Sequence, residues 1–371
     1  MNAVNLQHQA ESLTVRLHTA PNDSRPVYLV GSFNDWNPAD PDYLLRKTGQ
    51  DTFEYRFAKA AGLTFPLEYK FTRGGWDNVE LDEYGNETGN RVLHNNPVEI
   101  HVEVVRWSWN GLFYNPRFLP KIHILSEAFE IPQLIKTRRI TALLPHDYFE
   151  SNRRYPVLYL QDGQNLFDDY APFGSWGVDK KLAVLAEKGL HELIVIAIDH
   201  AQEERVKEFT PSYQTRLGRG DGKKYLRFLV ETLKPHIDSH FRTKTERSAT
   251  GIGGSSMGGL ISIYAGFLYP EVYGKLLIFS PSFLVEPNIH FQGINLHGFS
   301  DTRMYLYGGG EEGASMLPNL QRLKAALEAQ NVRANLNFHL SYDPTGKHNE
   351  ARWGEEFPRA IKWLYFDSSN P

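Results

Sequence analysis

A glycine-rich stretch, GIGGSSMGGL at residues 251–260, carries two adjacent serines. Ser256 has a glycine two positions away on each side, Gly254 and Gly258, and so fits the pattern G-x-S-x-G. A sharp strand-to-helix turn of this kind exposes the serine hydroxyl, and it needs glycine at these positions because larger side chains would collide. The apolar residues on both sides are typical of a strand before the turn and a helix after it. The stretch therefore predicts Ser256 as a catalytic nucleophile.

Other glycine-rich motifs fit the stretch less well. A phosphate-binding loop would need the pattern G-x-x-x-x-G-K-[ST], and no lysine follows these glycines. A dinucleotide-binding turn would need G-x-G-x-x-G, and Ser256 stands where its last glycine is required. A purely structural glycine turn is the remaining alternative, but the position between a strand and a helix favours the nucleophile.

A serine hydroxyl attacks only when a base takes its proton, and in this class of fold an acid and then a histidine follow the serine along the chain. His348 lies in the loop DPTGKHNEARW, after the last predicted strand and before the last predicted helix. That loop would lie at the same edge of the sheet as Ser256. His339 lies within a strand-like segment, and His290 and His297 lie in a polar loop. We therefore expect His348 to be the base.

The acid should follow the strand-like segment RMYLYGGG, where Glu311 and Glu312 both qualify. Asp343 is a third candidate, but it comes from the segment that leads to His348. A buried carboxylate in this place would orient the histidine and stabilise its protonated form. The residues alone leave both glutamates open.

An ester carbonyl under attack also needs hydrogen-bond donors for its developing negative charge. The backbone N–H of Met257, directly after the nucleophile, is the first expected donor. The second normally comes from the loop after an early strand, and LYLQDGQNLFDD supplies the N–H of Gln164.

The two parts of the chain differ in their patterns. Residues 1–110 contain short segments of alternating polar and apolar residues separated by turn residues, which predicts a β-sandwich. Residues 111–120 are rich in Asn, Gly and Pro and are expected to form a linker. In residues 121–371, apolar runs alternate with amphipathic helical stretches, which predicts an α/β domain with a mostly parallel central sheet.

Composition excludes several classes of function. The 371 residues include no cysteine, so disulfides and thiolate chemistry are excluded. The formal net charge of −4 argues against nucleic acid as a partner, and no apolar run is long enough to span a membrane. His236 and His240 have the spacing of a metal pair, but Ile237 stands where a zinc protease has glutamate. We expect a cytoplasmic protein with no metal and no cofactor, and the pattern predicts no oligomeric state.

Five segments together resemble the Putative esterase family of α/β-hydrolases: LYLQDGQNLFD, SWGVD, GGSSMGGLISIYAGFLYPEVYG, YGGGEEG and GKHNEARW. This family includes enterochelin esterases, feruloyl esterases and acetyl-xylan esterases. The resemblance covers residues 121–371 and points most to the enterochelin-esterase branch. It implies a catalytic triad of Ser256, His348 and Glu312. Glu312 fits the family better than Glu311 does, because a glycine follows it as in related sequences.

The resemblance also implies contacts with the substrate. In related mycolyltransferases, the position of Asp162 contacts the sugar substrate, and the position of Gln164 supplies the oxyanion amide. Trp176, in SWGVD, resembles a tryptophan near that site. Arg205 lies in the segment RVKEFTPS, which is similar to a family segment close to the active site. An ion pair between loops is the alternative for Arg205 and Glu208.

The first part of the chain is similar to the immunoglobulin-like modules of glycogen-binding proteins and branching enzymes. The similarity lies in VYLVGSFNDWNP and LEYKFTRGGW. It implies that Trp36, Lys70 and Trp76 could clamp an α-glucan by stacking and hydrogen bonding. The longer segment after Trp76 departs from the pattern of glycogen binders, so a structural role is the alternative.

Three functions follow from these observations. The first is a serine esterase of the enterochelin-esterase type, which acts on a small-molecule ester through an acyl-enzyme intermediate. The second is a carbohydrate esterase that removes acetyl or feruloyl groups from an oligosaccharide under the guidance of the first domain. The third is a non-catalytic sugar-binding or scaffold protein that retains only the hydrolase fold.

Overall fold

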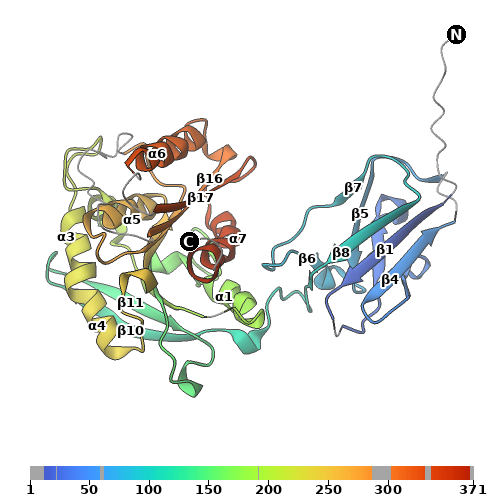
Figure 1. Cartoon of the computed structure of the whole chain (residues 1–371), viewed down its shortest axis with the longest axis horizontal. Coiled ribbons are helices and arrows are strands. Elements are labelled where there is room, and N and C mark those ends of the chain that lie inside the picture. The colour runs from blue at the N-terminus through green and yellow to red at the C-terminus, as the bar shows by residue number, and fades with distance from the viewer. Residues whose placement is uncertain are drawn as a thin grey trace, which may run out of the picture. The chain divides into compact units, whose positions relative to one another are not determined.

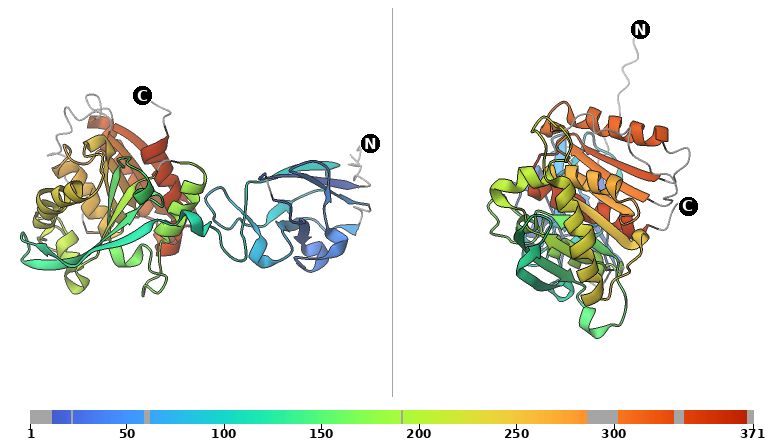
Figure 2. Two further views of the ribbon diagram at one scale, coloured as in Figure 1. Left: turned by 90° about the horizontal axis from the view of Figure 1, so that it is seen from below. Right: turned by 90° about the vertical axis from the view of Figure 1, so that its left-hand side faces the viewer.

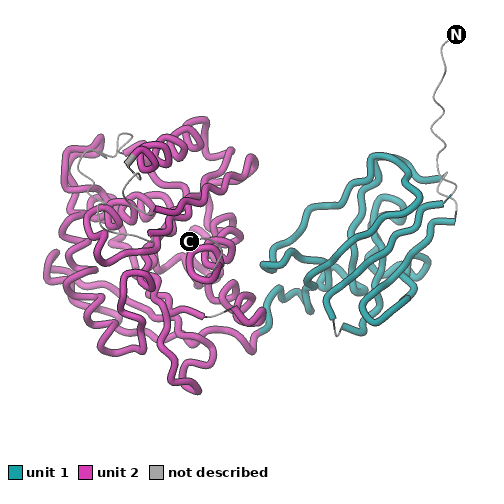
Figure 3. The backbone as a smooth tube through the Cα atoms, in the orientation of Figure 1, with its two compact units in different colours: residues 1–115 teal, residues 116–371 magenta. Residues whose placement is uncertain are grey.

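The structure is a computed structural model that describes residues 12–21, 23–58, 62–190, 192–285, 302–330 and 336–367. The chain divides into two compact units, Met1–Asn115 and Pro116–Pro371 (Figure 3). The division falls inside the segment for which the sequence predicts a linker. Each unit has its own hydrophobic core, and we describe the two separately.

Unit 1 is built from short strands, most of them in two sheets that share one hydrophobic core, with β6 and β9 forming a small sheet of their own. One sheet has the order β3-β4-β1-β8, and another has the order β2-β5-β7. Strand β1 shows why they pack: its buried residues Leu13, Val15 and Leu17 alternate with more exposed ones and meet Leu29 and Phe71 from the second sheet. The strands are β1 Leu13–Thr19, β2 Tyr28–Gly31, β3 Arg46–Lys47, β4 Thr52–Phe57, β5 Leu67–Thr72, β6 Glu80–Leu81, β7 Arg91–Leu93, β8 Glu99–Val104 and β9 Arg106–Trp107.

Unit 2 contains an eight-stranded sheet with the order β10-β11-β13-β12-β14-β15-β16-β17 among the described residues. From β13 to β17 all neighbours run parallel. Strand β11 runs antiparallel to both of its neighbours, β10 and β13. The strands are β10 Lys121–Ile131, β11 Lys136–Leu144, β12 Val157–Gln161, β13 Ile194–Ile198, β14 Thr250–Ser255, β15 Lys275–Phe279, β16 Thr302–Gly309 and β17 Leu336–Asp343.

Helices cover both faces of this sheet (Figures 1 and 2). In Figure 1, α3, α4 and α5 lie on one side of it, and α1 and α7 lie on the other. Buried residues of the strands alternate between the two faces, as parallel strands covered on both sides require. Tyr159 and Ile252 join the core under α5, whereas Phe279 stacks against Trp176 on the other face. The helices are α1 Val178–Glu187, α2 Arg205–Phe209, α3 Gly222–Arg227, α4 Lys234–His240, α5 Met257–Leu268, α6 Met316–Gln330 and α7 Glu350–Ile361.

The predicted fold class, an α/β domain with a mostly parallel sheet after a β-sandwich, is confirmed. The hairpin of β10 and β11 was not predicted. Strand β10 forms an edge of the sheet, and most of its side chains are exposed or half-buried, so it carries no continuous apolar run. The loops after β12, β14, β16 and β17 all leave the carboxyl edge of the sheet, which brings distant parts of the sequence together there.

Candidate active site

Ser256 is the single residue between the end of β14 and the start of α5, and its backbone has φ 55° and ψ −120°. Residues other than glycine rarely adopt a positive φ, and such strain is found where a side chain is held for function. The glycines permit the turn. A Cβ atom on Gly254 would lie 3.0 Å from the backbone of Gly258, and one on Gly258 would lie 3.0 Å from Gln161 Cβ and from Asp162 Oδ2.

His348 and Glu312 form a close pair. His348 Nδ1 lies 2.7 Å from Glu312 Oε2. The other oxygen of Glu312 accepts hydrogen bonds from the backbone N–H of Gly309 at 2.6 Å and from the hydroxyl of Ser280 at 2.7 Å. The indole of Trp353 donates in turn to Ser280 Oγ at 2.9 Å. Glu312 is thus a buried, fully hydrogen-bonded carboxyl group that orients the imidazole.

The two glutamates left open by the sequence have different surroundings. The side chain of Glu312 is 1% exposed and that of Glu311 is 51% exposed. Glu311 Oε2 lies 3.9 Å from the ammonium group of Lys347. Asp343 is bound by Arg352 at 2.7 Å rather than by the histidine.

Ser256 and His348 line the same pocket, which has a volume of about 330 Å³. The hydroxyl of Ser256 lies 3.0 Å from the hydroxyl of Ser282, and no hydrogen bond joins it to His348 in the described part of the chain. Catalytic hydrogen bonds are often long in a ligand-free site and tighten when a substrate binds. A rotation of the serine side chain would release it from Ser282.

The two expected oxyanion donors lie on turns at the edge of the sheet. Met257 is the first residue of α5, and the first N–H groups of a helix have no acceptor within it. Gln164 lies in the short 3₁₀ turn Gly163–Asn165 after β12. Its side-chain amide donates to the carbonyl of His200 at 3.1 Å and accepts from the N–H of His200 at 2.9 Å, which fixes the turn against the chain after β13.

Asp162 and Arg205 form a bidentate ion pair with distances of 2.6 and 2.8 Å. Burial disfavours the charge of Arg205, but the hydrogen bonds and negative charge of Asp162 outweigh it and raise the pKa of this guanidinium. Arg205 therefore pairs with Asp162, and not with Glu208, which binds Arg138 at 2.7 Å. Trp176 is 4% exposed and stacks on Phe279, which leaves it little surface for contact with a substrate.

Two of the three residues expected to hold sugar, Trp36 and Trp76, lie together in unit 1. The rings of Trp36 and Trp76 have centroids 6.4 Å apart and are tilted by 34°. Trp76 is 49% exposed, while Trp36 is half-buried and has a positive φ of 59°. The ammonium group of Lys70 is bound to the carbonyl of Thr88.

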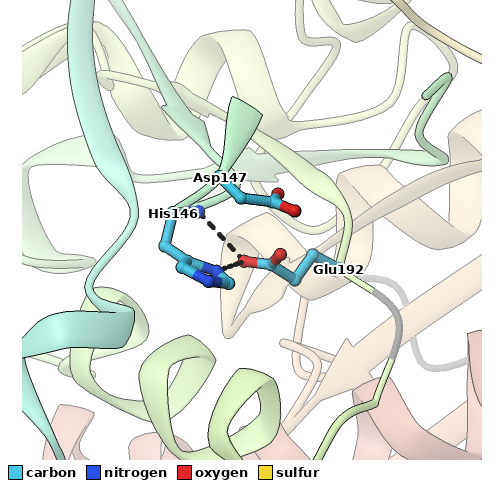
Figure 4. Close-up of side chains that lie close together, drawn as sticks. All are labelled: His146, Asp147 and Glu192. Atoms are coloured by element: carbon cyan, nitrogen blue, oxygen red, sulfur yellow. Dashed lines mark hydrogen bonds and ion pairs between the residues drawn. The ribbon is translucent and has the colours of Figure 1, made fainter. Parts of the chain in front are cut away.

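One group of side chains in the described part of the chain has the spacing of metal ligands: His146, Asp147 and Glu192 (Figure 4). Their ligand atoms lie within 4.8 Å of one another. Both Nδ1 and the backbone N–H of His146 contact the same oxygen of Glu192, at 2.9 and 3.0 Å. Asp147 is paired with Arg153. A metal would have to displace these partners, so the group is best described as a hydrogen-bonded cluster.

The model of the Putative esterase family matches residues 132–364. The chain belongs to this family. It is a carboxylic ester hydrolase with the predicted α/β-hydrolase fold. Among the described residues, no helix is both long enough and apolar enough to cross a membrane.

Several known proteins are similar to this esterase. The uncharacterized protein YbbA of Bacillus subtilis is 27% identical over 244 residues, which cover 62% of this chain and 92% of YbbA. An alpha-amylase of Niallia circulans is 38% identical over 94 residues, which cover 25% of this chain and 7% of the amylase. The crystal structure of an enterochelin esterase from Shigella flexneri covers 95% of this chain and 92% of its own, with a TM-score of 0.53 and 15% identity. This last likeness shows the fold alone.

The sequence did not indicate three residues in and around the pocket of this esterase: Ser280, Ser282 and Trp353. Ser280 and Ser282 follow β15, the strand beside the one that carries Ser256, so their place at a carboxyl edge was a usable signal. Trp353, on α7, carries no such signal because its role depends on how that helix packs against the sheet.

Of the other candidate histidines, His290 and His297 lie outside the described residues. His339 stacks on Tyr305 with ring centroids 4.7 Å apart.

Proposed function

We propose that this esterase uses Ser256 as its nucleophile, His348 as general base and Glu312 as the acid that orients the histidine. The observation that carries the proposal is the 2.7 Å contact between His348 Nδ1 and Glu312 Oε2, beside the pocket that Ser256 lines. With Nδ1 donating to the carboxylate, Nε2 is the ring nitrogen that can take the serine proton.

In the first half of the reaction, Ser256 Oγ attacks the carbonyl carbon of the ester while His348 Nε2 takes the hydroxyl proton. The carbonyl oxygen becomes an oxyanion, which accepts hydrogen bonds from the N–H groups of Met257 and Gln164. The carbon–oxygen bond to the alcohol then breaks, and the departing oxygen receives the proton from His348. The acyl group remains on Ser256.

In the second half, a water molecule gives a proton to His348 and attacks the acyl carbon. A second oxyanion forms at the same donors, and its collapse releases the acid and returns the proton to Ser256. Glu312 stays ionised throughout and stabilises the positive charge of the imidazolium. These steps use the three side chains, the two backbone N–H groups and one water.

We propose a siderophore-type ester as the substrate class. The fold likeness to an enterochelin esterase extends over 95% of the chain and therefore includes both units. The pocket also has a mixed lining that suits an aryl group with hydroxyls: Phe283 and Met316 are apolar, whereas Ser315 and Asn319 can form hydrogen bonds.

A second candidate is an esterase that acts on acylated oligosaccharides. The exposed face of Trp76 beside Trp36 favours it, because paired indoles offer a stacking surface to sugar rings. A 94-residue stretch that is 38% identical to an alpha-amylase adds support. The third function, a non-catalytic scaffold, conflicts with membership of an esterase family.

The test is turnover of an ester panel by the wild type and by Ser256→Ala, with Ser255→Ala as the matched control. The panel contains short p-nitrophenyl esters, a catechol trilactone, methyl ferulate and acetylated xylo-oligosaccharides. We expect Ser256→Ala to lose about 10⁴-fold or more in kcat, as other serine hydrolases do. Ser255→Ala should stay within about tenfold of the wild type, since only its neighbour acts as nucleophile. Wild-type turnover by Ser256→Ala would refute the proposal, and preference for the xylo-oligosaccharide would favour the second candidate.

A further inference from the structure

Glu350 joins the two loops that carry the base and an oxyanion donor. It is the first residue of α7, two positions after His348. Its Oε1 accepts a hydrogen bond of 3.3 Å from the side-chain amide of Asn165. Asn165 ends the 3₁₀ turn and directly follows Gln164, whose N–H is the proposed donor. One side chain therefore connects the turn after β12 with the loop after β17.

Charged groups approach this carboxyl group from several elements. Burial raises the pKa of Glu350, the negative charge of Asp162 raises it further, and the positive charge of His348 acts against both. The negative charge of Glu350 also helps to raise the pKa of Arg205, although the two hydrogen bonds of that guanidinium go to Asp162. His348 is held at Nδ1 by Glu312, and Glu350 lies two residues further along the chain, at the start of α7.

We propose that Glu350 is a positioning residue for the hydrolysis, which ties the oxyanion turn to the histidine loop. The inference rests on the proposed roles of Ser256, His348 and Gln164. It goes beyond them because Glu350 lies outside the triad and acts through Asn165. An oxyanion forms in both halves of the reaction, so a donor that is held in place favours each of them.

The tether can be tested by substitution at both of its ends. Glu350→Gln keeps a carbonyl oxygen that can accept from the side-chain amide of Asn165, so kcat should stay within about twofold of the wild type. Glu350→Ala and Asn165→Ala each remove the tether. Both should lower kcat by about tenfold and leave KM nearly unchanged, because a misplaced oxyanion donor weakens transition-state binding.

The experiment measures kcat and KM of the full chain on a p-nitrophenyl ester for which Ser256→Ala has lost turnover. Glu328→Ala, on α6, is the control because it truncates a helical carboxylate whose ion pair with Lys324 lies on the surface. Wild-type kcat in both Glu350→Ala and Asn165→Ala would overturn this inference and leave the nucleophile untouched. Turnover retained by Ser256→Ala would instead overturn the proposed function together with this inference.

Discussion

Glu311 and Glu312 are chemically identical neighbours, and the structure gives them opposite surroundings. The oxygens of Glu312 contact His348, Ser280 and the N–H of Gly309, whereas the side chain of Glu311 is half exposed. A carboxylate held by these contacts keeps its position and selects one tautomer of the imidazole. The difference between the two positions is therefore a difference of packing.

We expect Glu312→Gln to lower kcat by about 10²–10⁴-fold on a p-nitrophenyl ester. The amide is neutral, and its N–H₂ group can turn toward Nδ1 and select the wrong tautomer of His348. Glu311→Gln is the matched control and should change kcat by about twofold or less, because its side chain is exposed. Equal losses in both variants would show that Glu312 is not the triad acid.

The sequence alone indicates site residues that lie in motifs, but it indicates few of the residues that support them. Ser256 and His348 could be chosen from their spacing and chain order. Glu312 needed a family resemblance, because nothing in EEG itself distinguishes the two glutamates. Glu350 gave no signal at all, since its importance lies in a 3.3 Å contact with Asn165 from another part of the chain.

At the scale of elements, the turn between β14 and α5 packs against the turn after β12. Gly258 in the first turn of α5 faces Asp162, whose carboxylate is held by Arg205. The strained serine and the two proposed oxyanion donors therefore depend on one close contact between two elements. A methyl group on Gly258 would fit only if Asp162 or Gln161 moved by a few tenths of an ångström.

Gly258→Ala should disturb this contact. The new Cβ would lie 3.0 Å from Asp162 Oδ2, and the ion pair with Arg205 resists the shift that would relieve the overlap. We expect a loss of about 1–3 kcal/mol in the free energy of unfolding, the usual effect of overpacking. Turnover should also fall by about tenfold or more, since a displacement of about 1 Å at the turn is costly. Thermal melting and ester kinetics measure both.

Gly89→Ala serves as the control for that experiment, because a Cβ at Gly89 would meet open space. Its Tm and turnover should match those of the wild type. An unchanged Tm and kcat in Gly258→Ala would mean that the turn can move apart freely.

Sequence patterns predicted the buried parallel strands because each is a short apolar run between turn residues. They did not predict β10, where Ile122 and Ile124 are each 50% exposed and polar residues interrupt the apolar ones. An edge strand is stabilised by its single neighbour, β11, so its own residues need not be buried. Pairing of this kind can be seen only in three dimensions.

At the scale of the whole molecule, each unit has its own hydrophobic core and its own candidate site. Unit 2 holds the proposed triad, while unit 1 holds the pair of Trp36 and Trp76. Removal of one exposed indole should not disturb the hydrophobic core of either unit, because Trp76 is 49% exposed. Sugar binding and ester hydrolysis can therefore be tested independently in the full chain.

The second candidate function predicts that the wild type is retarded in a native gel that contains glycogen or starch. Trp76→Ala should lose that retardation, and turnover of a p-nitrophenyl ester should remain within about twofold of the wild type. Trp109→Ala is the matched control, because Trp109 is also exposed in unit 1 but is covered on one face by Arg25. Equal retardation of all three proteins, or none in the wild type, would remove the sugar-directed function.

The positive φ of Ser256 gives the folded enzyme a chemical signature. The hydroxyl is presented only while the turn is held in its strained form by β14 and α5, and an unfolded chain has no reason to keep that conformation. A fluorophosphonate reacts with a serine that a neighbouring base activates and leaves ordinary serines alone. Labelling of Ser256, the proposed nucleophile, would thus count correctly folded molecules in a crude extract before any natural substrate is known.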